Sequence, residues 1–501
     1  MVVQHNMQAA NANRMLNVTT SAQSKSTEKL SSGYRINRAA DDAAGLTISE
    51  KMRKQIRGLD QASTNAQDGV SSVQTAEGAL TEVHSMLQRM NELATQAANG
   101  TNSKDSDRQA IQDEIDQLTT EIDRVSETTK FNETYLLKGE DGTKTINMKA
   151  HDAGLKGKLT DNGDGTATFV MDTLNAGDKV SIGGKSYTIG SDDAEVDKWF
   201  TDNGNDVKDE ATKKVTVNGT EYTYYAAKAA NTTAGSLTDG WDAGWYASAP
   251  TDKGDGTGTA LSGKFANVDA IKAEVKKGAT VQNGTKSVTG MNDTTPKDGV
   301  SDTDATVISK NKAYELASKE LLKANQIGDT EGNAQVGTGA DVDVAVDLTH
   351  GDGTFSIKVG QAKVANSLAF SLHVGADADM TNKIQVNIDA MDSASLGIKG
   401  LNVKDDSGNA ATYAVDAISD AISKVSSQRS ALGAVQNRLE HTINNLDNVV
   451  ENTTTAESRI RDTDMAEEMV NYSKNNILAQ AGQSMLAQAN QSNQGVLSLL
   501  Q

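Results

Sequence analysis

The sequence of 501 residues contains no cysteine, only two prolines, and 4% aromatic residues. The lack of cysteine excludes disulfide bonds and thiolate metal sites. Because a compact enzyme of this length normally buries many aromatic rings, the low aromatic content argues against a large catalytic domain. The apolar residues that remain are mainly Ala, Val, Leu, Ile and Met, which suit long helices with narrow apolar seams.

The chain also lacks an excess of basic charge, since 68 acidic residues outnumber 48 basic ones and the formal net charge is -20. Phosphate binding needs a basic face, so we expect no nucleic-acid partner. The first residues, MVVQHNMQAANANRML, lack the positive run and apolar stretch of a secretory signal peptide. No apolar segment of 18 residues occurs, so we expect no membrane partner. If the protein leaves the cell, we expect export that uses no cleavable signal.

What the first part of the chain does contain is an apolar repeat of seven residues. Such a repeat is typical of a coiled coil, and it predicts a helix over about 46–99, roughly 80 Å long. Asn99-Gly100 is the expected end of this helix. A shorter helix through Ile111 and Val125 is expected to pack antiparallel against it. The two series of the repeat are Leu59, Ala66, Val73, Leu80, Leu87 and Ala94, and Ala62, Gly69, Ala76, Val83, Met90 and Ala97.

The last part of the chain repeats the scheme. Arg429 and Gln436 interrupt its apolar seam, and we interpret them as polar contacts that set the register. The expected core of the paired helices therefore includes Leu59, Val73, Leu80, Leu87, Ile418, Val425, Leu432, Leu439 and Leu446.

The outermost segments at both ends carry weaker apolar stripes among Gln, Asn and Ser. Alone, these stripes bury too little apolar area to offset chain entropy. We predict that the outermost segments are disordered in the monomer and fold when neighbouring chains supply the missing surface. The residues expected to drive this polymerisation are Val3, Met7, Leu16, Leu30, Met465, Met469, Leu486, Leu497 and Leu500.

The middle of the chain is rich in Gly, Thr, Asp and Lys and is predicted to form strands. Residues 179–190 and 214–226 alternate β-forming residues around Gly-Gly and Asn-Gly, which indicates two hairpins. Gly-Asp-Gly units recur from Asn162, Lys253 and His350. One helix is expected over about 307–326.

No motif for catalysis or metal binding stands out. The Gly-Asp-Gly turns lack the ligand spacing of a calcium loop, so we interpret their glycines as turn positions. None of the six histidines has the spacing of a zinc-protease helix, and no nucleophile elbow or phosphate loop occurs. We therefore expect no enzyme activity, no metal site and no cofactor.

Four long blocks stand out at the two ends of the chain: SSGYRINRAADDAAGLTISEKMR from Ser31, LQRMNELATQAANGTNS from Leu87, GAVQNRLEHTINNL from Gly433 and SRIRDTDMAEEM from Ser458. In these blocks both ends of the chain resemble bacterial flagellins. A further block, residues 372–403, resembles the family's β-hairpin segment. Where the family often has Gly after Phe131-Asn132, this chain has Glu133.

The resemblance implies a fold that is mainly α at both termini, with long coiled-coil-like helices packed as a bundle. A β-hairpin segment and a mostly β insertion would make the whole chain a multi-domain α+β protein. Residues 1–44 and 459–501 would form the polymerisation domain, and residues 45–140 and 365–458 the helical core domain. Residues 141–364 would form a variable, surface-exposed insertion.

The implied function is that of a secreted structural subunit of the extracellular flagellar filament, used for motility. Its partners would be other copies of the same chain, an export chaperone, and cap and hook-junction proteins, with export through the flagellar type III apparatus. The family is also recognised by the host's Toll-like receptor 5, and Arg89, Leu93 and Glu114 fall on the contact positions by motif. Two alternatives stay open: a hook–filament junction protein, or a filament subunit whose insertion acts as an adhesin.

Overall fold

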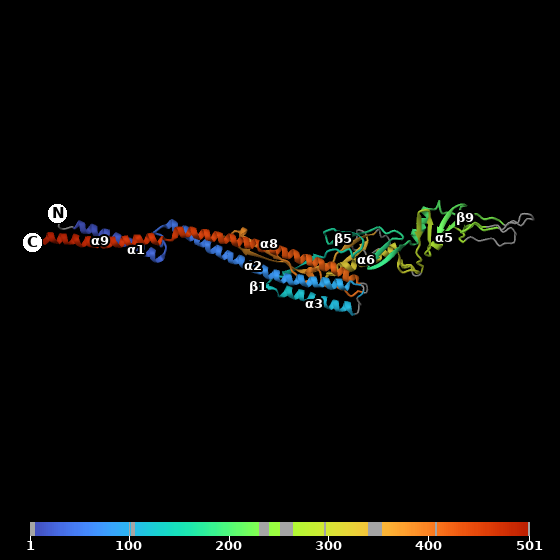
Figure 1. Ribbon diagram of the computed structural model, residues 1–501, viewed down its shortest axis with the longest axis horizontal. Coiled ribbons are helices and arrows are strands. Elements are labelled where there is room, and N and C mark those ends of the chain that lie inside the picture. Colours follow the sequence, from blue (N-terminus) through green and yellow to red (C-terminus); the bar gives the residue numbers. More distant parts are fainter. Residues whose placement is uncertain are drawn as a thin grey trace, which may run out of the picture. The chain divides into compact units, whose positions relative to one another are not determined.

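The computed structural model describes residues 6–99, 101, 106–229, 240–250, 264–294, 297–338, 353–405 and 408–498 (Figure 1). The chain divides into two compact units. Unit 1 comprises Met1–Thr75, Ala369–Asn387 and Ser430–Gln501. Unit 2 comprises Ala76–Leu368 and Ile388–Arg429.

Long helices at both ends and a β-rich insertion between them confirm the predicted fold class. The helices are α1 (Met7–Ser32), α2 (Ala43–Ala97), α3 (Asp107–Thr128), α8 (Asn409–Arg461) and α9 (Met465–Ser498). Helix α2 begins three residues before the predicted start and ends two before the predicted end. Apolar residues every seven positions explain its length, because they place a continuous stripe on one side of the helix.

In unit 1, α2 and α8 pack antiparallel. Arg53 lies 3.5 Å from Glu457, and the Ser63 hydroxyl donates to Asp447 at 3.1 Å. The hairpin segment, with β17 (Leu368–His373), η2 (Met380–Asn382) and β18 (Lys383–Ile388), packs on this pair. A Cβ at position 69 would lie 2.2 Å from Leu372 Cδ1, so the glycine in the heptad series makes room for the hairpin.

Helices α1 and α9 also pack antiparallel in unit 1 (Figure 1). Asn6 donates to the Ala489 carbonyl at 3.3 Å, and Lys29 lies 3.9 Å from Glu468. The segments that connect them to α2 and α8 are bonded to each other, since Arg35 N donates to Arg461 O at 2.7 Å.

In unit 2, α3 packs antiparallel on the second half of α2, as predicted. Arg89 bonds to Glu114, and Arg108 bonds to the carbonyl of Ala97. The start of α8 completes the bundle, and Arg429 lies 3.5 Å from Glu77. Beyond α3, the short strands β1 (Lys130–Phe131) and β2 (Thr134–Tyr135) form a hairpin.

The turn of this hairpin contains the departure from the family pattern. Asn132 has φ +46° and Glu133 has φ +68°, so both residues are left-handed. The chain therefore keeps the turn without glycine, at a cost in backbone strain.

In its described residues, the insertion contains three sheets and the β3–β16 pair that leads into them. Strand β3 (Glu140–Asn147) pairs antiparallel with β16 (Gln361–Asn366). One sheet has the order β14-β15-β5-β4 and another β13-β7-β6, and both pack with α6 (Lys310–Asn325) around Phe169, Phe355 and Tyr314. Their strands are β4 (Gly157–Asp161), β5 (Thr166–Met171), β6 (Lys179–Ile182), β7 (Lys185–Gly190), β13 (Val307–Ser309), β14 (Gln335–Thr338) and β15 (Thr354–Lys358).

The third sheet has the order β10-β9-β8-β11-β12 and a separate core around Trp245, Ile271 and Val281. Helices α4 (Asp193–Asp202) and α5 (Val268–Val275) contribute to this core. The strands are β8 (Lys214–Val217), β9 (Thr220–Tyr225), β10 (Gly244–Tyr246), β11 (Thr280–Asn283) and β12 (Lys286–Thr289). A short helix, α7 (Ser393–Leu396), precedes α8.

The local predictions for the insertion can be compared with these elements. Both hairpins are confirmed, as β6–β7 and β8–β9. The helix predicted over 307–326 begins later, because residues 307–309 form β13. The unit from Asn162 is the turn between β4 and β5. The unit from Lys253 lies outside the described residues, and so does the start of the unit from His350.

Candidate assembly and recognition surfaces

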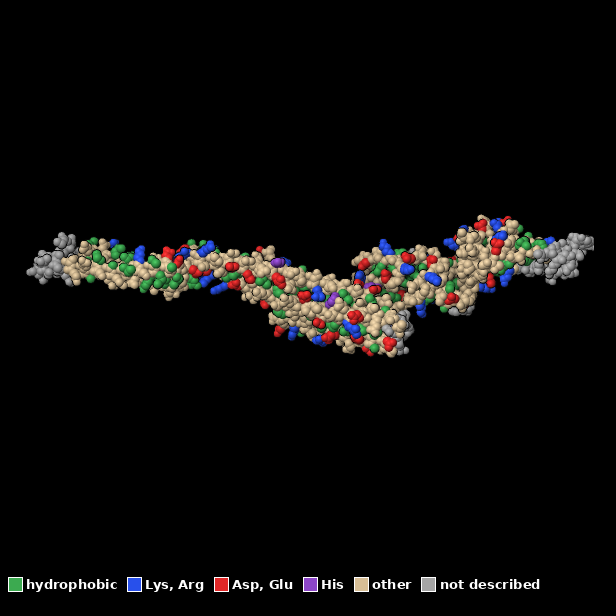
Figure 2. Space-filling model, in the orientation of Figure 1, with side chains coloured by type: hydrophobic (Ala, Val, Ile, Leu, Met, Phe, Trp, Pro, Cys, Tyr) green, Lys and Arg blue, Asp and Glu red, His purple; other side chains and the backbone are tan. Residues whose placement is uncertain are grey.

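Exposed apolar side chains concentrate on α1 and α9. Fourteen large apolar residues are exposed among the described residues, and nine of them lie on these two helices. Figure 2 shows apolar side chains gathered along this part of the molecule. The nine are Met7, Met15, Val18, Met465, Met469, Val470, Ile477, Leu478 and Met485, each between 47% and 70% exposed. We call these nine residues the terminal stripe.

Few side chains are fully buried between α1 and α9. Ser26 is the buried residue of α1, and Ala479 is buried on α9. Such small side chains contribute little hydrophobic free energy. The large apolar side chains of the terminal stripe therefore remain exposed although the two helices are paired.

The residues predicted to drive polymerisation include both exposed and half-buried ones. Met7, Met465 and Met469 belong to the terminal stripe, whereas Leu16, Leu30 and Leu486 are half-buried. Val3 and Leu500 lie outside the described residues, and so does the side chain of Leu497. Sequence analysis missed Val470, Ile477 and Met485. Their signal is a seven-residue spacing from Val470 to Ile477 and from Leu478 to Met485.

The predicted coiled-coil core lies inside. Leu59 is half-buried. The other eight predicted core residues, Val73, Leu80, Leu87, Ile418, Val425, Leu432, Leu439 and Leu446, are at most 6% exposed. The paired helices with this buried seam support the residues on their outer faces.

One exposed charged cluster lies on that support. Arg89 Nε donates to Glu114 at 2.9 Å, and its Nη1 donates to Glu92 at 3.3 Å. These hydrogen bonds to Glu114 and then Glu92 raise the pKa of Arg89 above its ordinary value. The predicted partner residue Leu93 is only 2% exposed. The apolar contact expected of Leu93 is therefore not offered to solvent, because this side chain belongs to the helix packing.

Neither a metal centre nor a membrane helix stands out in the described part of the chain. No group of three or more His, Asp and Glu residues there could hold a metal ion. Among the same residues, every helix is too short or too polar to cross a membrane.

Comparisons with known proteins agree with this architecture. The model of the bacterial flagellin N-terminal helical region matches residues 3–141, and that of the C-terminal helical region matches residues 415–500. A flagellin of Clostridium tyrobutyricum is 36% identical over 99% of this chain and 100% of its own length. A flagellin of Bacillus subtilis is 33% identical over 100% of both chains.

Among solved structures, FliC from Burkholderia pseudomallei is 19% identical and is matched over 74% of this chain and 99% of that chain. Its TM-score of 0.24 is too low to add an argument. The sequence matches span the whole chain at more than 30% identity, and they join the two helical ends to one family. The chain therefore belongs to the bacterial flagellins, the structural subunits of the extracellular flagellar filament.

Proposed function

We propose that this chain polymerises by burying the terminal stripe of α1 and α9 against neighbouring copies. The observation that carries the proposal is the concentration of nine exposed apolar residues on two helices whose mutual interface buries little. Exposed apolar surface of this extent marks an interaction site. In the filament this surface would become the innermost core.

The first experiment measures the critical concentration for growth from filament fragments, by light scattering and electron microscopy. Ile477 is 66% exposed, and Ile477→Gln removes about 1–2 kcal/mol of burial in the polymer. We expect the critical concentration of Ile477→Gln to rise roughly tenfold.

The matched control is Val170→Gln, because Val170 is a comparably exposed apolar residue on β5 in the insertion, at 45%. We expect this control to polymerise like the unchanged chain. An unchanged critical concentration for Ile477→Gln would refute the role of the terminal stripe.

We also propose that residues 1–44 and 459–501 fold stably only on assembly. The nine residues of the terminal stripe are exposed in the single chain, so a neighbouring copy that covers them stabilises the folded form by mass action. Limited proteolysis at low protein concentration tests this coupling. We expect cleavage in both segments in the monomer and protection in the filament, and resistance in the monomer would count against it.

For the remaining segments we propose a division of labour. Residues 45–140 and 365–458 form the supporting helical domain, and residues 141–364 project outward and are not needed for assembly. The insertion has two apolar cores of its own, around Phe169 and around Trp245. We expect a chain without residues 141–364 to polymerise, and electron microscopy of the seeded protein checks this. Correctly folded helices that fail to polymerise would refute it.

We further propose secretion through the flagellar type III apparatus, with an export chaperone on the C-terminal end and cap and hook-junction proteins as assembly partners. The lack of cysteine supports passage as an unfolded chain, because no disulfide has to be broken. In cells with the flagellar export gate deleted, we expect the protein to stay inside. Undiminished secretion from those cells would exclude this route.

Finally, we propose that the Arg89–Glu114 pair is part of a surface recognised by Toll-like receptor 5. Both side chains are exposed, and Arg89 presents a planar fork that suits carboxylate or carbonyl partners. Leu93 is buried in the helix packing beneath these exposed side chains and supports the surface indirectly.

Binding of the purified receptor ectodomain to the monomer tests the proposal. We expect Arg89→Ala combined with Glu114→Ala to weaken binding by roughly tenfold or more. Arg124→Ala is the matched control, because Arg124 forms a similar exposed pair with Glu121 on α3. Equal binding by the double variant and the control would refute the surface.

A further inference from the structure

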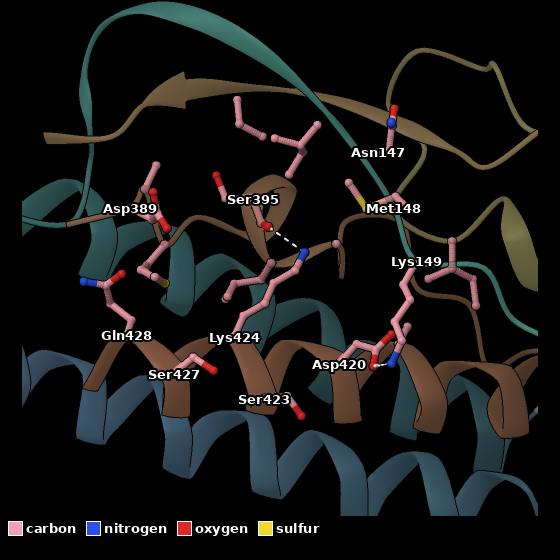
Figure 3. A pocket seen from close by; sticks show the side chains of 18 of the residues that line it. Asn147, Met148, Lys149, Asp389, Ser395, Asp420, Ser423, Lys424, Ser427 and Gln428 are labelled. Carbon is pink, nitrogen blue, oxygen red and sulfur yellow. Dashed lines mark hydrogen bonds and ion pairs between the residues drawn. The ribbon is translucent and has the colours of Figure 1, made fainter. Parts of the chain in front are cut away.

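A cavity of about 590 Å³ lies within unit 2, between α8, the segment around α7, and strands β3 and β16 (Figure 3). Its volume is in the range of pockets that bind small molecules. Apolar side chains form much of its wall, among them Ile146, Met148, Val364, Met391 and Leu396. A ligand with an apolar body would therefore replace water that the wall binds poorly.

The ionic groups of the cavity wall leave an excess of positive charge. Three lysines, Lys144, Lys149 and Lys424, line the cavity together with Asp389 and Asp420, so three positive and two negative charges give +1. His151 adds no charge near neutral pH, because burial lowers its pKa.

The two carboxylates are already neutralised. Lys149 donates to Asp420 at 2.8 Å, and Lys144 lies 3.6 Å from Asp389. Lys424 differs from both lysines, because it forms no ion pair within 4 Å among the described residues. Its ammonium donates to the Ser395 carbonyl at 3.2 Å. An ammonium has three N–H donors, so Lys424 can still donate hydrogen bonds to a ligand.

Figure 3 shows Lys424 reaching from α8 across the cavity towards Ser395. The protein around this ammonium removes water from it, and this lowers the pKa of Lys424 below its ordinary value. A partly desolvated cation gains more from an anion than a fully hydrated one does. Asp152 and Asp416 add negative charge on the His151 side. The charge of Asp420 also acts on Lys424, but Asp420 is itself paired with Lys149, so an anionic group is favoured at the Lys424 ammonium.

We propose that this cavity binds a small amphipathic anion, with its carboxylate on Lys424 and its apolar body along Met148, Val364 and Leu396. The ligand class is a carboxylate with an unbranched or aromatic body of about eight carbon atoms, well within the cavity volume. This site is separate from the terminal stripe and does not depend on the proposed mode of polymerisation.

The probe is octanoate, added to the full-length chain and followed by isothermal titration calorimetry and ligand-observed NMR. Octanol and octylamine share its apolar body but carry neutral and positive groups. We expect octanoate to bind, octanol to bind at least tenfold more weakly, and octylamine not to bind. A charge-assisted hydrogen bond accounts for a difference of this size.

Three variants locate the site. Lys424→Gln is expected to weaken octanoate binding tenfold or more, whereas Lys424→Arg keeps the charge and most of the affinity. Lys185→Gln removes the same charge from an exposed position on β7 and is expected to bind like the unchanged chain. Thermal unfolding followed by circular dichroism checks that each variant is folded.

The proposal is overturned if octanoate does not bind to the unchanged chain, or if Lys424→Gln binds it equally well. Octanol binding as tight as octanoate would also overturn it, since the cation would then have no role. If the octanoate affinity differed between monomer and filament only because a neighbouring chain fills the cavity, the site would belong to a carboxylate of a second copy. That result would likewise overturn the proposal.

Discussion

Arg108 is a buried cation that holds the end of α2 against the start of α3. It is 2% exposed, and its guanidinium donates to three carbonyl oxygens. The distances are 2.9 Å to Ala97, 2.8 Å to Asp405 and 3.4 Å to Asn99. Ala97 is the last residue of α2 and is fully buried. The last carbonyls of a helix have no partner within the helix, so Arg108 bonds to a carbonyl that would otherwise be buried without one.

The change to test is Arg108→Met, which keeps an apolar stem and removes the donors. A hydrogen bond from a charged group contributes about 1.5–3 kcal/mol. Two of the three bonds are short, and the cost of burying the cation offsets part of their gain. We therefore expect a loss of about 3 kcal/mol in the local stability of the α2–α3 corner.

The measurement is amide hydrogen exchange over residues 76–99 and 106–128, followed by mass spectrometry. Global unfolding is less suitable, because a chain with two units need not unfold in one transition. A loss of about 3 kcal/mol corresponds to exchange about a hundredfold faster at this corner.

Arg124→Met is the control, since Arg124 lies on the same helix but is exposed and, among the described residues, its side chain bonds to Glu121 alone. We expect no measurable change in exchange for this control, because exposed ion pairs contribute little. If Arg108→Met exchanged no faster than Arg124→Met, the reasoning from buried carbonyls would be wrong.

Three further predictions follow from burial, backbone strain and protonation. Leu80→Ala should lower the local stability of α2 by about 3 kcal/mol, measured by amide hydrogen exchange over residues 76–97, because Leu80 is fully buried, whereas Leu59→Ala at a half-buried position should cost less. Glu133→Gly should raise the thermal midpoint slightly, since about 1 kcal/mol of left-handed strain is relieved and partly offset by chain entropy. Burial lowers the pKa of His151 in the folded chain. Below about pH 6.5 the unfolded chain therefore binds a proton more readily than the folded chain, so stability falls as the pH falls. Between pH 7 and pH 5, the thermal midpoint of His151→Gln should fall less than that of the unchanged chain or of His441→Gln.

The sequence predicts the seam of the helical bundle well, because burial there repeats with the period of the helix. Val73, Leu80 and Leu87 are seven residues apart and all are fully buried. The same periodicity gives no reason for Arg108, whose partners Ala97 and Asp405 lie on different segments. A buried arginine in a polar stretch looks like any surface residue in the sequence.

Leu93 and the cavity both show what sequence patterns cannot predict. A motif placed Leu93 on a recognised surface, but a motif carries no information on which side chain is covered, and Leu93 is buried. The cavity depends on Met148, Ser395 and Lys424, which are far apart in the sequence and meet only because β3, α7 and α8 pack together. No spacing rule predicts such a group of residues.

The α2–α8 and α1–α9 pairs are both built from helices with apolar repeats, but they serve different purposes. The α2–α8 seam buries its leucines within one subunit, whereas the α1–α9 pair buries small residues and leaves the terminal stripe exposed. Subunit stability and polymerisation should therefore respond to different substitutions. Leu80→Ala should lower the stability of the monomer and leave the critical concentration nearly unchanged while the subunit remains folded. Ile477→Gln should raise the critical concentration without changing the stability of the helical bundle. If either variant changed both quantities in proportion, the two helical pairs would form one cooperative unit, and the separation inferred from burial would be wrong.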